Sequence, residues 1–216
     1  MTKGQEALSI IRETGVIAIM RAQNSDQLLR AADAIQQGGV RAIEVTMTTP
    51  GALAMIEQAA AKHDEGVLYG VGSVLDGETA RAAILAGAQF VVSPSFKPEL
   101  VEVCRRYSVP VAVGAFTPTE VVTAWECGAD MVKVFPASLG GPGLIKALKA
   151  PLPQVDLVPV GGVRIENTAD FIRAGSAAVG VGSALIDQKL LDAGEFAALA
   201  DRARQLIQEV ANGRAD

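Results

Sequence analysis

This chain of 216 residues contains few cysteines, histidines and aromatic residues. Its two cysteines, Cys104 and Cys127, stand far apart without Cys-x-x-Cys spacing, which argues against a disulfide framework and against a zinc site. The single histidine, His63, follows a predicted helix among charged residues, so we predict an exposed surface residue rather than a base. No group of histidine and carboxylate residues has the spacing of metal ligands, and we therefore expect no metal cofactor.

The chain also lacks an excess of positive charge and long hydrophobic runs. Its formal net charge of −5 produces no basic field, so neither nucleic acid nor an anionic membrane is an expected partner, although a small anion could bind locally. No apolar run approaches the roughly 20 residues that span a bilayer, and the first residues lack the apolar core of a signal peptide. No linker or low-complexity segment divides the sequence. We expect a cytoplasmic protein with one domain over residues 1–216.

The chain does contain a regular alternation of short apolar runs and amphipathic stretches. Eight runs are predicted to be strands: residues 16–20, 41–46, 67–71, 89–92, 110–113, 131–135, 157–160 and 177–181. Four of the stretches between them stop at a glycine shortly before the next strand, the pattern of a left-handed helix C-cap: Gly39, Gly87, Gly128 and Gly175.

Local signals predict where several helices begin. Asn24 precedes an apolar helical pattern, and Thr49 and Thr117 each place a capping hydroxyl before a proline. Thr117 and Glu120 have the spacing of a capping box. Within the predicted helices we expect Trp125 to pack against neighbouring elements, and Lys146 and Lys149 to face solvent.

Alternating strands and helices predict a parallel sheet, and eight such units in this length close most economically into an α/β (β/α)8 TIM barrel. We expect an additional N-terminal helix over residues 5–13 and a C-terminal helix from Gly194 that packs on the bottom or side of the barrel. An open doubly wound sheet is the alternative. It would usually carry a Gly-x-Gly-x-x-Gly turn after the first strand, where this chain has MRAQN at residues 20–24.

Lys133 occupies the middle of a strand-like segment, DMVKVFP at residues 130–136. Side-chain alternation places it on the side of Met131 and Phe135, with Val132 and Val134 on the other side. Both sides are apolar, as in a parallel strand covered on both faces, where lysine is rare. Burial would lower the pKa of the amine and make it available as a nucleophile. The alternative is a lysine that extends its ammonium group to solvent.

A barrel of this kind carries its active site at the C-terminal ends of its strands. Strands two and six are opposite in a ring of eight, so Glu44, on the lumen side with Ala42 and Thr46, is predicted to face Lys133 across the mouth. The pair could be a buried ion pair. The same two residues would also suit Schiff-base chemistry. In that chemistry an amine, here Lys133, condenses with a ketone, and a carboxyl group, here Glu44, transfers protons. Other polar residues at these strand ends are Arg21, Ser73, Ser93 and Ser95.

Glycines follow the seventh and eighth strands, in the segments VGGV at residues 160–163 and GVGS at residues 180–183. A short apolar, helix-like piece is predicted at residues 184–186. Loops at these strands with exposed backbone N–H groups predict a phosphate-binding site, with ordinary tight turns as the alternative.

These motifs, in this order, resemble the 2-keto-3-deoxy-6-phosphogluconate (KDPG) and 4-hydroxy-2-oxoglutarate (KHG) aldolase family, which includes the 6-phosphogalactonate aldolases. The motifs are EVT at residues 44–46, GSV at 72–74, VSP at 92–94, VKVFPA at 132–137, GGV at 161–163 and GS at 182–183. The resemblance covers nearly the whole chain. It implies a (β/α)8 barrel and a class I, metal-independent aldolase that is commonly a trimer.

The resemblance also implies roles for individual residues. Lys133 corresponds to the Schiff-base lysine and Glu44 to the general acid/base. Ser73 stands where the family usually has a threonine and keeps the hydroxyl group. The implied substrate-binding positions are Arg21, Thr46, Ser73, Pro94, Phe135, Gly161, Gly162, Gly182 and Ser183.

Two positions depart from the gluconate-type pattern. Thr48 stands where such members often have an arginine, so Arg21 is expected to bind the substrate carboxylate instead. Val160 precedes the glycine pair where gluconate-type enzymes often have threonine and galactonate-type enzymes have valine. The sequence therefore leaves the preferred C4 epimer open.

We expect reversible cleavage of a 2-keto-3-deoxy-6-phospho sugar acid, first of all KDPG, to pyruvate and glyceraldehyde 3-phosphate. The reaction would use a covalent imine on Lys133 and no cofactor, in a homotrimer. The galactonate epimer and KHG are alternative substrates. A phosphosugar isomerase or epimerase, or a non-catalytic phosphosugar-binding barrel, are alternatives of another class.

Overall fold

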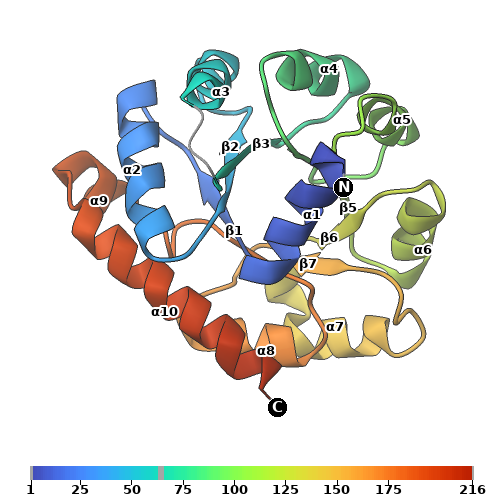
Figure 1. Cartoon of the computed structure of the whole chain (residues 1–216). Coiled ribbons are helices and arrows are strands. Elements are labelled where there is room, and N and C mark those ends of the chain that lie inside the picture. Colours follow the sequence, from blue (N-terminus) through green and yellow to red (C-terminus); the bar gives the residue numbers. More distant parts are fainter. Residues whose placement is uncertain (1, 63–65, 216) are drawn as a thin grey trace.

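The computed structural model describes residues 2–62 and 66–215 and shows a barrel of eight parallel strands (Figure 1). The strands follow one another in chain order, and a single bridge between Val160 and Gly180 joins the last two edges. The predicted (β/α)8 barrel is confirmed, while His63 lies outside the described residues. The strands are β1 (Val16–Met20), β2 (Ala42–Thr46), β3 (Leu68–Gly72), β4 (Val91–Val92), β5 (Val111–Ala115), β6 (Met131–Val134), β7 (Leu157–Pro159) and β8 (Val179–Val181).

Helices cover the outside of the barrel, and α1 crosses its N-terminal end (Figure 1). The helices are α1 (Lys3–Thr14), α2 (Ser25–Gln37), α3 (Ala52–Ala61), α4 (Gly77–Leu85), α5 (Pro98–Arg106), α6 (Pro118–Glu126), the 3-10 helix η1 (Ala137–Leu139), α7 (Gly141–Lys149), α8 (Ile165–Arg173), α9 (Gln188–Ala193) and α10 (Phe196–Arg214). Within the described residues, no helix is long and apolar enough to cross a membrane.

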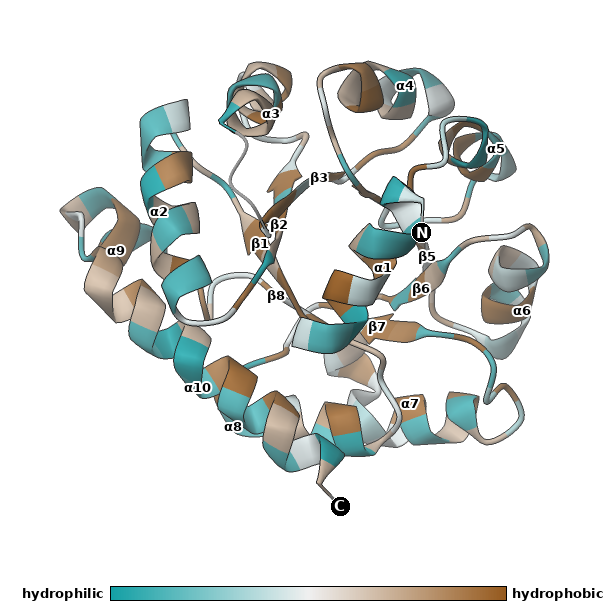
Figure 2. Ribbon diagram, viewed as in Figure 1, coloured by the Kyte–Doolittle hydropathy of each residue, from teal (hydrophilic) through white to brown (hydrophobic). Residues whose placement is uncertain are grey.

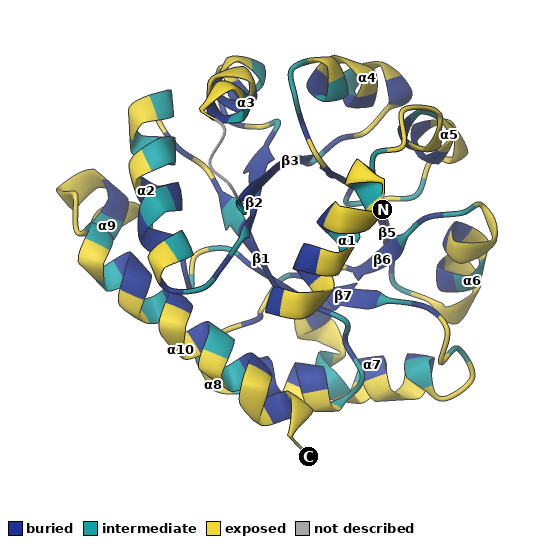
Figure 3. Ribbon diagram, viewed as in Figure 1, coloured by how far each residue is buried: buried dark blue, intermediate teal, exposed yellow. Residues whose placement is uncertain are grey.

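Side-chain alternation along the strands separates two apolar cores. Residues such as Val45 and Val132 face outward and pack beneath the helices. Residues such as Phe90 and Met131 face inward and fill the lower lumen, where Ile11 of α1 closes it. The strands are accordingly apolar in Figure 2 and mostly buried in Figure 3. Polar side chains that point inward above this layer are therefore held in a largely apolar surrounding.

The predicted helix starts are correct at Asn24 and Thr117. The Asn24 side chain accepts a hydrogen bond from the amide of Gln27, and Thr117 forms the predicted capping box with Glu120. The predicted cap at Thr49 is wrong, because α3 begins two residues later, after Gly51 in the left-handed conformation. Thr49 is buried, and its hydroxyl lies 3.2 Å from that of Thr46 instead.

The four glycines predicted to end helices all have positive φ values, between 90° and 105°. A side chain would strain the backbone in this region, so these turns require glycine. Each glycine returns the chain from a helix toward the next strand, and this repeated device sets the spacing of the barrel units.

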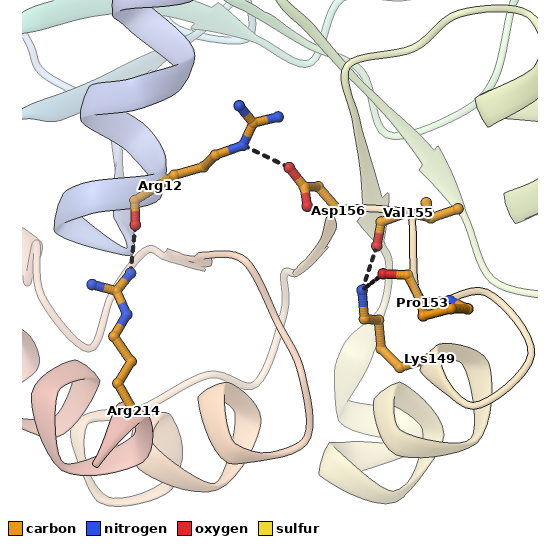
Figure 4. A network of polar contacts seen from close by, with 6 residues as sticks. All are labelled: Arg12, Lys149, Pro153, Val155, Asp156 and Arg214. Atoms are coloured by element: carbon orange, nitrogen blue, oxygen red, sulfur yellow. Dashed lines mark hydrogen bonds and ion pairs between the residues drawn. The ribbon is translucent and has the colours of Figure 1, made fainter. Parts of the chain in front are cut away.

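The C-terminal helix α10 packs along the side of the barrel against α8 and α2, as predicted. Its buried face comprises Leu199, Ala200, Ala203, Leu206, Val210 and Gly213. At its end, the Arg214 guanidinium donates hydrogen bonds to the carbonyl groups of Arg12 and Glu13 in the last turn of α1. Figure 4 shows the bond to Arg12. Arg12 in turn pairs with Asp156 at 2.7 Å, so three distant segments meet below the barrel.

Two predictions about helix side chains are wrong. The Lys149 ammonium does not simply face solvent, because it donates hydrogen bonds to the carbonyl groups of Pro153 and Val155 at 2.7 and 2.9 Å (Figure 4). It therefore ties the end of α7 to the loop before β7. Trp125 is not packed inside, since 41% of it is exposed on α6.

Candidate active site

Glu44 of β2 and Lys133 of β6 both point into the upper lumen and are only 2% and 5% exposed. Ala42 and Met131, two residues below them on the same strands, belong to the lumen core, which fixes the direction of both side chains. No carboxylate oxygen of Glu44 lies within the 4.0 Å ion-pair distance of Lys133 Nζ. The two groups thus face one another without forming a direct ion pair.

The electrostatic setting changes the acidity of both groups. Burial lowers the pKa of Lys133, which the Glu44 carboxylate partly restores and the Arg21 guanidinium lowers further. Burial raises the pKa of Glu44, against the opposing effect of Lys133 and Arg21. Both shifts act toward the neutral forms of the two groups, an amine and a carboxyl group.

Three inward-facing glycines make room in the lumen for groups of neighbouring strands. A Cβ atom at Gly72 would lie 1.7 Å from Oε1 of Glu44, and one at Gly114 would lie 2.0 Å from the Pro94 carbonyl oxygen. A Cβ atom at Gly180 would lie 2.6 Å from a methyl group of Val160. The lumen at this level is therefore filled by side chains and carbonyl groups that reach across from neighbouring strands.

Phe135 connects the lysine to the loop that follows β7. Lys133 Nζ lies 5.2 Å from the centre of the Phe135 ring, within reach of a cation–π contact when the amine is protonated. A Cβ atom at Gly161 would meet the edge of the same ring at 3.4 Å. The ring, which is 40% exposed, is thus one wall of the mouth between Lys133 and the glycine loop.

Three threonine hydroxyl groups form a cluster at the end of β2. Thr46 Oγ1 lies 3.0 Å from Thr48 Oγ1 and 3.2 Å from Thr49 Oγ1. Thr46 and Thr49 are buried, whereas Thr48 is exposed. Thr48, at the position that departs from the gluconate-type pattern, therefore takes part in orienting Thr46.

The remaining predicted binding residues surround the same mouth. Ser73 follows β3 in the left-handed region, with φ 58°, and is half-buried. Pro94 follows β4, and its carbonyl group leans over Gly114, the strand neighbour of Lys133. Arg21, which follows β1, is exposed but acts on both Glu44 and Lys133. The structure thus brings residues from five strands around one opening.

The two glycine loops lie at neighbouring strand ends. Gly161 and Gly162 have φ values of 87° and 82°, which only glycine adopts readily, and they turn the chain after β7. Gly182 follows β8, with no atom within 4 Å of the space its side chain would fill. Ser183 beside it is exposed.

The helix-like piece predicted after Ser183 is only a single turn, in which the amides of Leu185 and Ile186 both donate to the Gly182 carbonyl group. The next helix, α9, begins at Gln188. The predicted phosphate site would therefore rest on backbone N–H groups of this loop rather than on a long helix.

Sequence reasoning missed the glycines on the inner surface, Gly72 and Gly114. The available signal was the spacing of Gly70 and Gly72, which places two glycines on one face of a strand. Within residues 2–62 and 66–215, no group of three histidine, cysteine or carboxylate residues could hold a metal ion.

Comparisons with known proteins agree with this geometry. A model of the family described as KDPG and KHG aldolase matches residues 8–201. A 2-dehydro-3-deoxy-phosphogluconate aldolase of Treponema pallidum is 37% identical over 209 residues, which cover 95% of this chain and 96% of that protein. A 2-dehydro-3-deoxy-6-phosphogalactonate aldolase of Escherichia coli is 37% identical over 171 residues, which cover 79% and 83%.

Among solved structures, one described as native KDPGal is 32% identical and superimposes with a TM-score of 0.86 over 93% of this chain and 96% of that one. The family match spans most of the chain and includes every residue of the candidate site. The chain belongs to the KDPG and KHG aldolase family and is an aldolase, a carbon–carbon lyase.

Proposed function

We propose that this aldolase is a class I enzyme that reversibly cleaves KDPG to pyruvate and glyceraldehyde 3-phosphate through an imine on Lys133. The observation that carries this proposal is a buried lysine of lowered pKa that faces Glu44 without a direct ion pair. A structural ion pair would be expected to close to contact distance, because each buried charge is stabilised by its partner. The two groups instead stay apart, so a direct ion pair does not occupy the Lys133 amine.

In the cleavage direction, the Lys133 amine attacks the C2 ketone, and water leaves to give an iminium ion. Glu44, directly or through a water molecule, removes the proton of the C4 hydroxyl group. The C3–C4 bond then breaks, its electron pair moves toward the iminium nitrogen, and glyceraldehyde 3-phosphate departs. The remaining enamine takes up a proton at C3, and water hydrolyses the imine to pyruvate and free Lys133.

The surrounding residues are proposed to hold the substrate in place. Arg21 and Ser73 are suited to bind the carboxylate, since one supplies a cation and the other a hydroxyl donor. The phosphate would be bound by backbone N–H groups of the glycine loops and by the Ser183 hydroxyl group. The residues of these loops are Gly161, Gly162, Gly182 and Ser183. Phe135, Thr46 and Pro94 would line the end of the site where the bond breaks. Phosphate binding far from the bond that breaks positions this bond without entering the chemistry.

Two relatives bear on this assignment through their own ligands. A KDPG aldolase of Legionella pneumophila, 24% identical with a TM-score of 0.86, was captured with pyruvate as a covalent carbinolamine intermediate. A KDPG aldolase of Zymomonas mobilis, 25% identical with a TM-score of 0.83, was solved with 3-phosphoglycerate. The first ligand supports the covalent step, and the second supports a phosphorylated substrate.

The 6-phosphogalactonate epimer is a second candidate substrate. Val160, which is 7% exposed, offers a methyl group rather than a hydroxyl group beside the glycine pair, and a galactonate-type enzyme is among the similar relatives. Specificity constants measured in parallel for KDPG, its C4 epimer and KHG separate the three candidates. We further propose, from the family resemblance, that the enzyme is a cytoplasmic homotrimer.

The assignment is tested by trapping the imine. The enzyme is incubated with pyruvate and borohydride, and intact mass and peptide mapping locate the reduced adduct. We expect a single adduct on Lys133 and none in Lys133→Arg, which keeps the charge but cannot form an imine. Circular dichroism and thermal unfolding of Lys133→Arg check that its fold is retained.

Either of two results contradicts the assignment. Wild-type enzyme that is folded but forms no adduct favours an isomerase or a binding protein, for which no covalent imine is needed. Appreciable cleavage by Lys133→Arg removes Lys133 from the mechanism.

A further inference from the structure

Gly72 ends β3 on the inner surface of the barrel, directly beside the Glu44 carboxyl group. In the sheet register, Thr46 pairs with Gly72 and Glu44 pairs with Gly70, so Glu44 leans upward along β2 to reach Gly72. A Cβ atom at Gly72 would lie 1.7 Å from Oε1, 2.2 Å from Cδ and 2.6 Å from Cγ of Glu44. All three nearest atoms belong to Glu44, which therefore occupies the space that any larger residue would fill.

The backbone itself does not require glycine at this position. Gly72 lies in a regular strand and, unlike Gly161 and Gly162, does not have a positive φ value. An alanine could therefore adopt the same backbone conformation without strain. What glycine provides here is space for one functional side chain.

We propose that Gly72 is a positioning residue that holds the Glu44 carboxyl group in its place opposite Lys133. This proposal rests on the proposed role of Glu44 in proton transfer. The colliding atoms Oε1, Cδ and Cγ all belong to one side chain and none to the backbone, so we expect an alanine at position 72 to move the carboxyl group and to leave the barrel intact. Acid–base catalysis depends on a proton donor or acceptor within hydrogen-bonding distance, and a displaced carboxyl group loses that position.

The test is a double-mutant cycle with Gly72→Ala, Glu44→Ala and the double variant. We expect kcat for KDPG cleavage to fall about 100-fold in Gly72→Ala, a loss typical of acid–base catalysis. In the Glu44→Ala background, where the colliding atoms are absent, Gly72→Ala should change kcat by less than about twofold. Comparing Gly72→Ala in the wild type and in Glu44→Ala thus separates an effect on Glu44 from a general loss of structure.

Two further measurements distinguish positioning from a structural role. The limb of the pH profile of kcat/KM that Glu44 produces in the wild type should shift or vanish in Gly72→Ala, because the carboxyl group has changed its surroundings. The pyruvate adduct on Lys133 should still form after borohydride reduction. If Gly72→Ala does not fold, the proposal is tested on the double variant. This variant lacks the colliding Glu44 atoms, so it should fold.

Wild-type kcat in Gly72→Ala overturns the proposal, and so does an equal loss in both backgrounds. Misfolding of both the single and the double variant also overturns it. A failure of the underlying function is visible separately: Glu44→Ala would keep wild-type turnover, or wild-type enzyme would form no pyruvate adduct. Either result removes the role of Gly72 together with that of Glu44.

Discussion

The pKa of Lys133 depends on two charged residues that act in opposite directions. The Glu44 carboxylate stabilises the ammonium form, whereas the Arg21 guanidinium destabilises it. Burial adds the largest effect, because a charged amine loses its hydration in the lumen. The pKa of Lys133 lies below its ordinary value as a result, which leaves more free amine at neutral pH than an exposed lysine has.

Neutralising each neighbour should therefore shift the Lys133 pKa in a different direction. Glu44→Gln removes an attractive charge and should lower this pKa further, whereas Arg21→Gln removes a repulsive charge and should raise it. Reductive methylation with formaldehyde requires the free amine but no binding of an acid substrate. The pH midpoint of Lys133 methylation, followed by peptide mapping, should move down in Glu44→Gln and up in Arg21→Gln.

Methylation of Lys149, whose ammonium binds two carbonyl groups outside the site, serves as an internal control. The extent of methylation of Lys149 at one fixed pH should be the same in all three proteins. Equal shifts of Lys133 in both variants, or no shift, would contradict the electrostatic account.

At the scale of elements, Arg214 joins the end of α10 to the end of α1 below the barrel. The last carbonyl groups of a helix have no partner within the helix. In α1, those of Arg12 and Glu13 accept hydrogen bonds from Arg214 of α10. Because α1 also covers the lower lumen with Ile11, this capping contact links the C-terminal helix to the inner core.

We expect Arg214→Ala to lower the free energy of unfolding by about 1 kcal/mol, since hydrogen bonds from an exposed guanidinium group contribute modestly. Urea unfolding measures the change, and kcat should stay at the wild-type value because Arg214 lies at the end of the barrel away from the site. Arg204→Ala on the same helix is the matched control. Within the described part of the chain, Arg204 pairs only with the exposed Asp201 one turn away, and its loss should change stability by less than about 0.5 kcal/mol. Equal losses in the two variants would show that the α1 contact contributes nothing specific.

At the scale of the whole molecule, several large apolar side chains remain exposed on the described surface. Leu139 is 74% exposed, Leu85 63% and Leu75 56%. Isolated exposed apolar residues are ordinary in monomers, so this surface alone does not define an interface. It is compatible with the homotrimer that the family resemblance implies.

Light scattering after size-exclusion chromatography should give about three times the 22.3 kDa mass of one chain. The mass should persist on dilution through the micromolar range, as for a stable oligomer. A mass equal to that of one chain at these concentrations would contradict the trimer without affecting the chemistry proposed for the lumen.

Much of this architecture follows from the sequence alone. The eight apolar runs, four of which follow a glycine turn, predict the barrel because these signals are local and repeat along the chain. Glu44 and Lys133 are recognisable for a similar reason. Each is a charged residue in an otherwise apolar strand, and side-chain alternation assigns both to the lumen.

Only the tertiary structure decides what each residue contacts. Thr49 has the local pattern of a helix cap but binds Thr46, and Lys149 has the spacing of an exposed helix residue but binds the loop before β7. The space that Gly72 provides for Glu44 likewise depends on the register between two strands. Local patterns specify which elements form and which way their side chains point. Contacts between elements depend on distances set by the closed barrel, and no short stretch of sequence contains these distances.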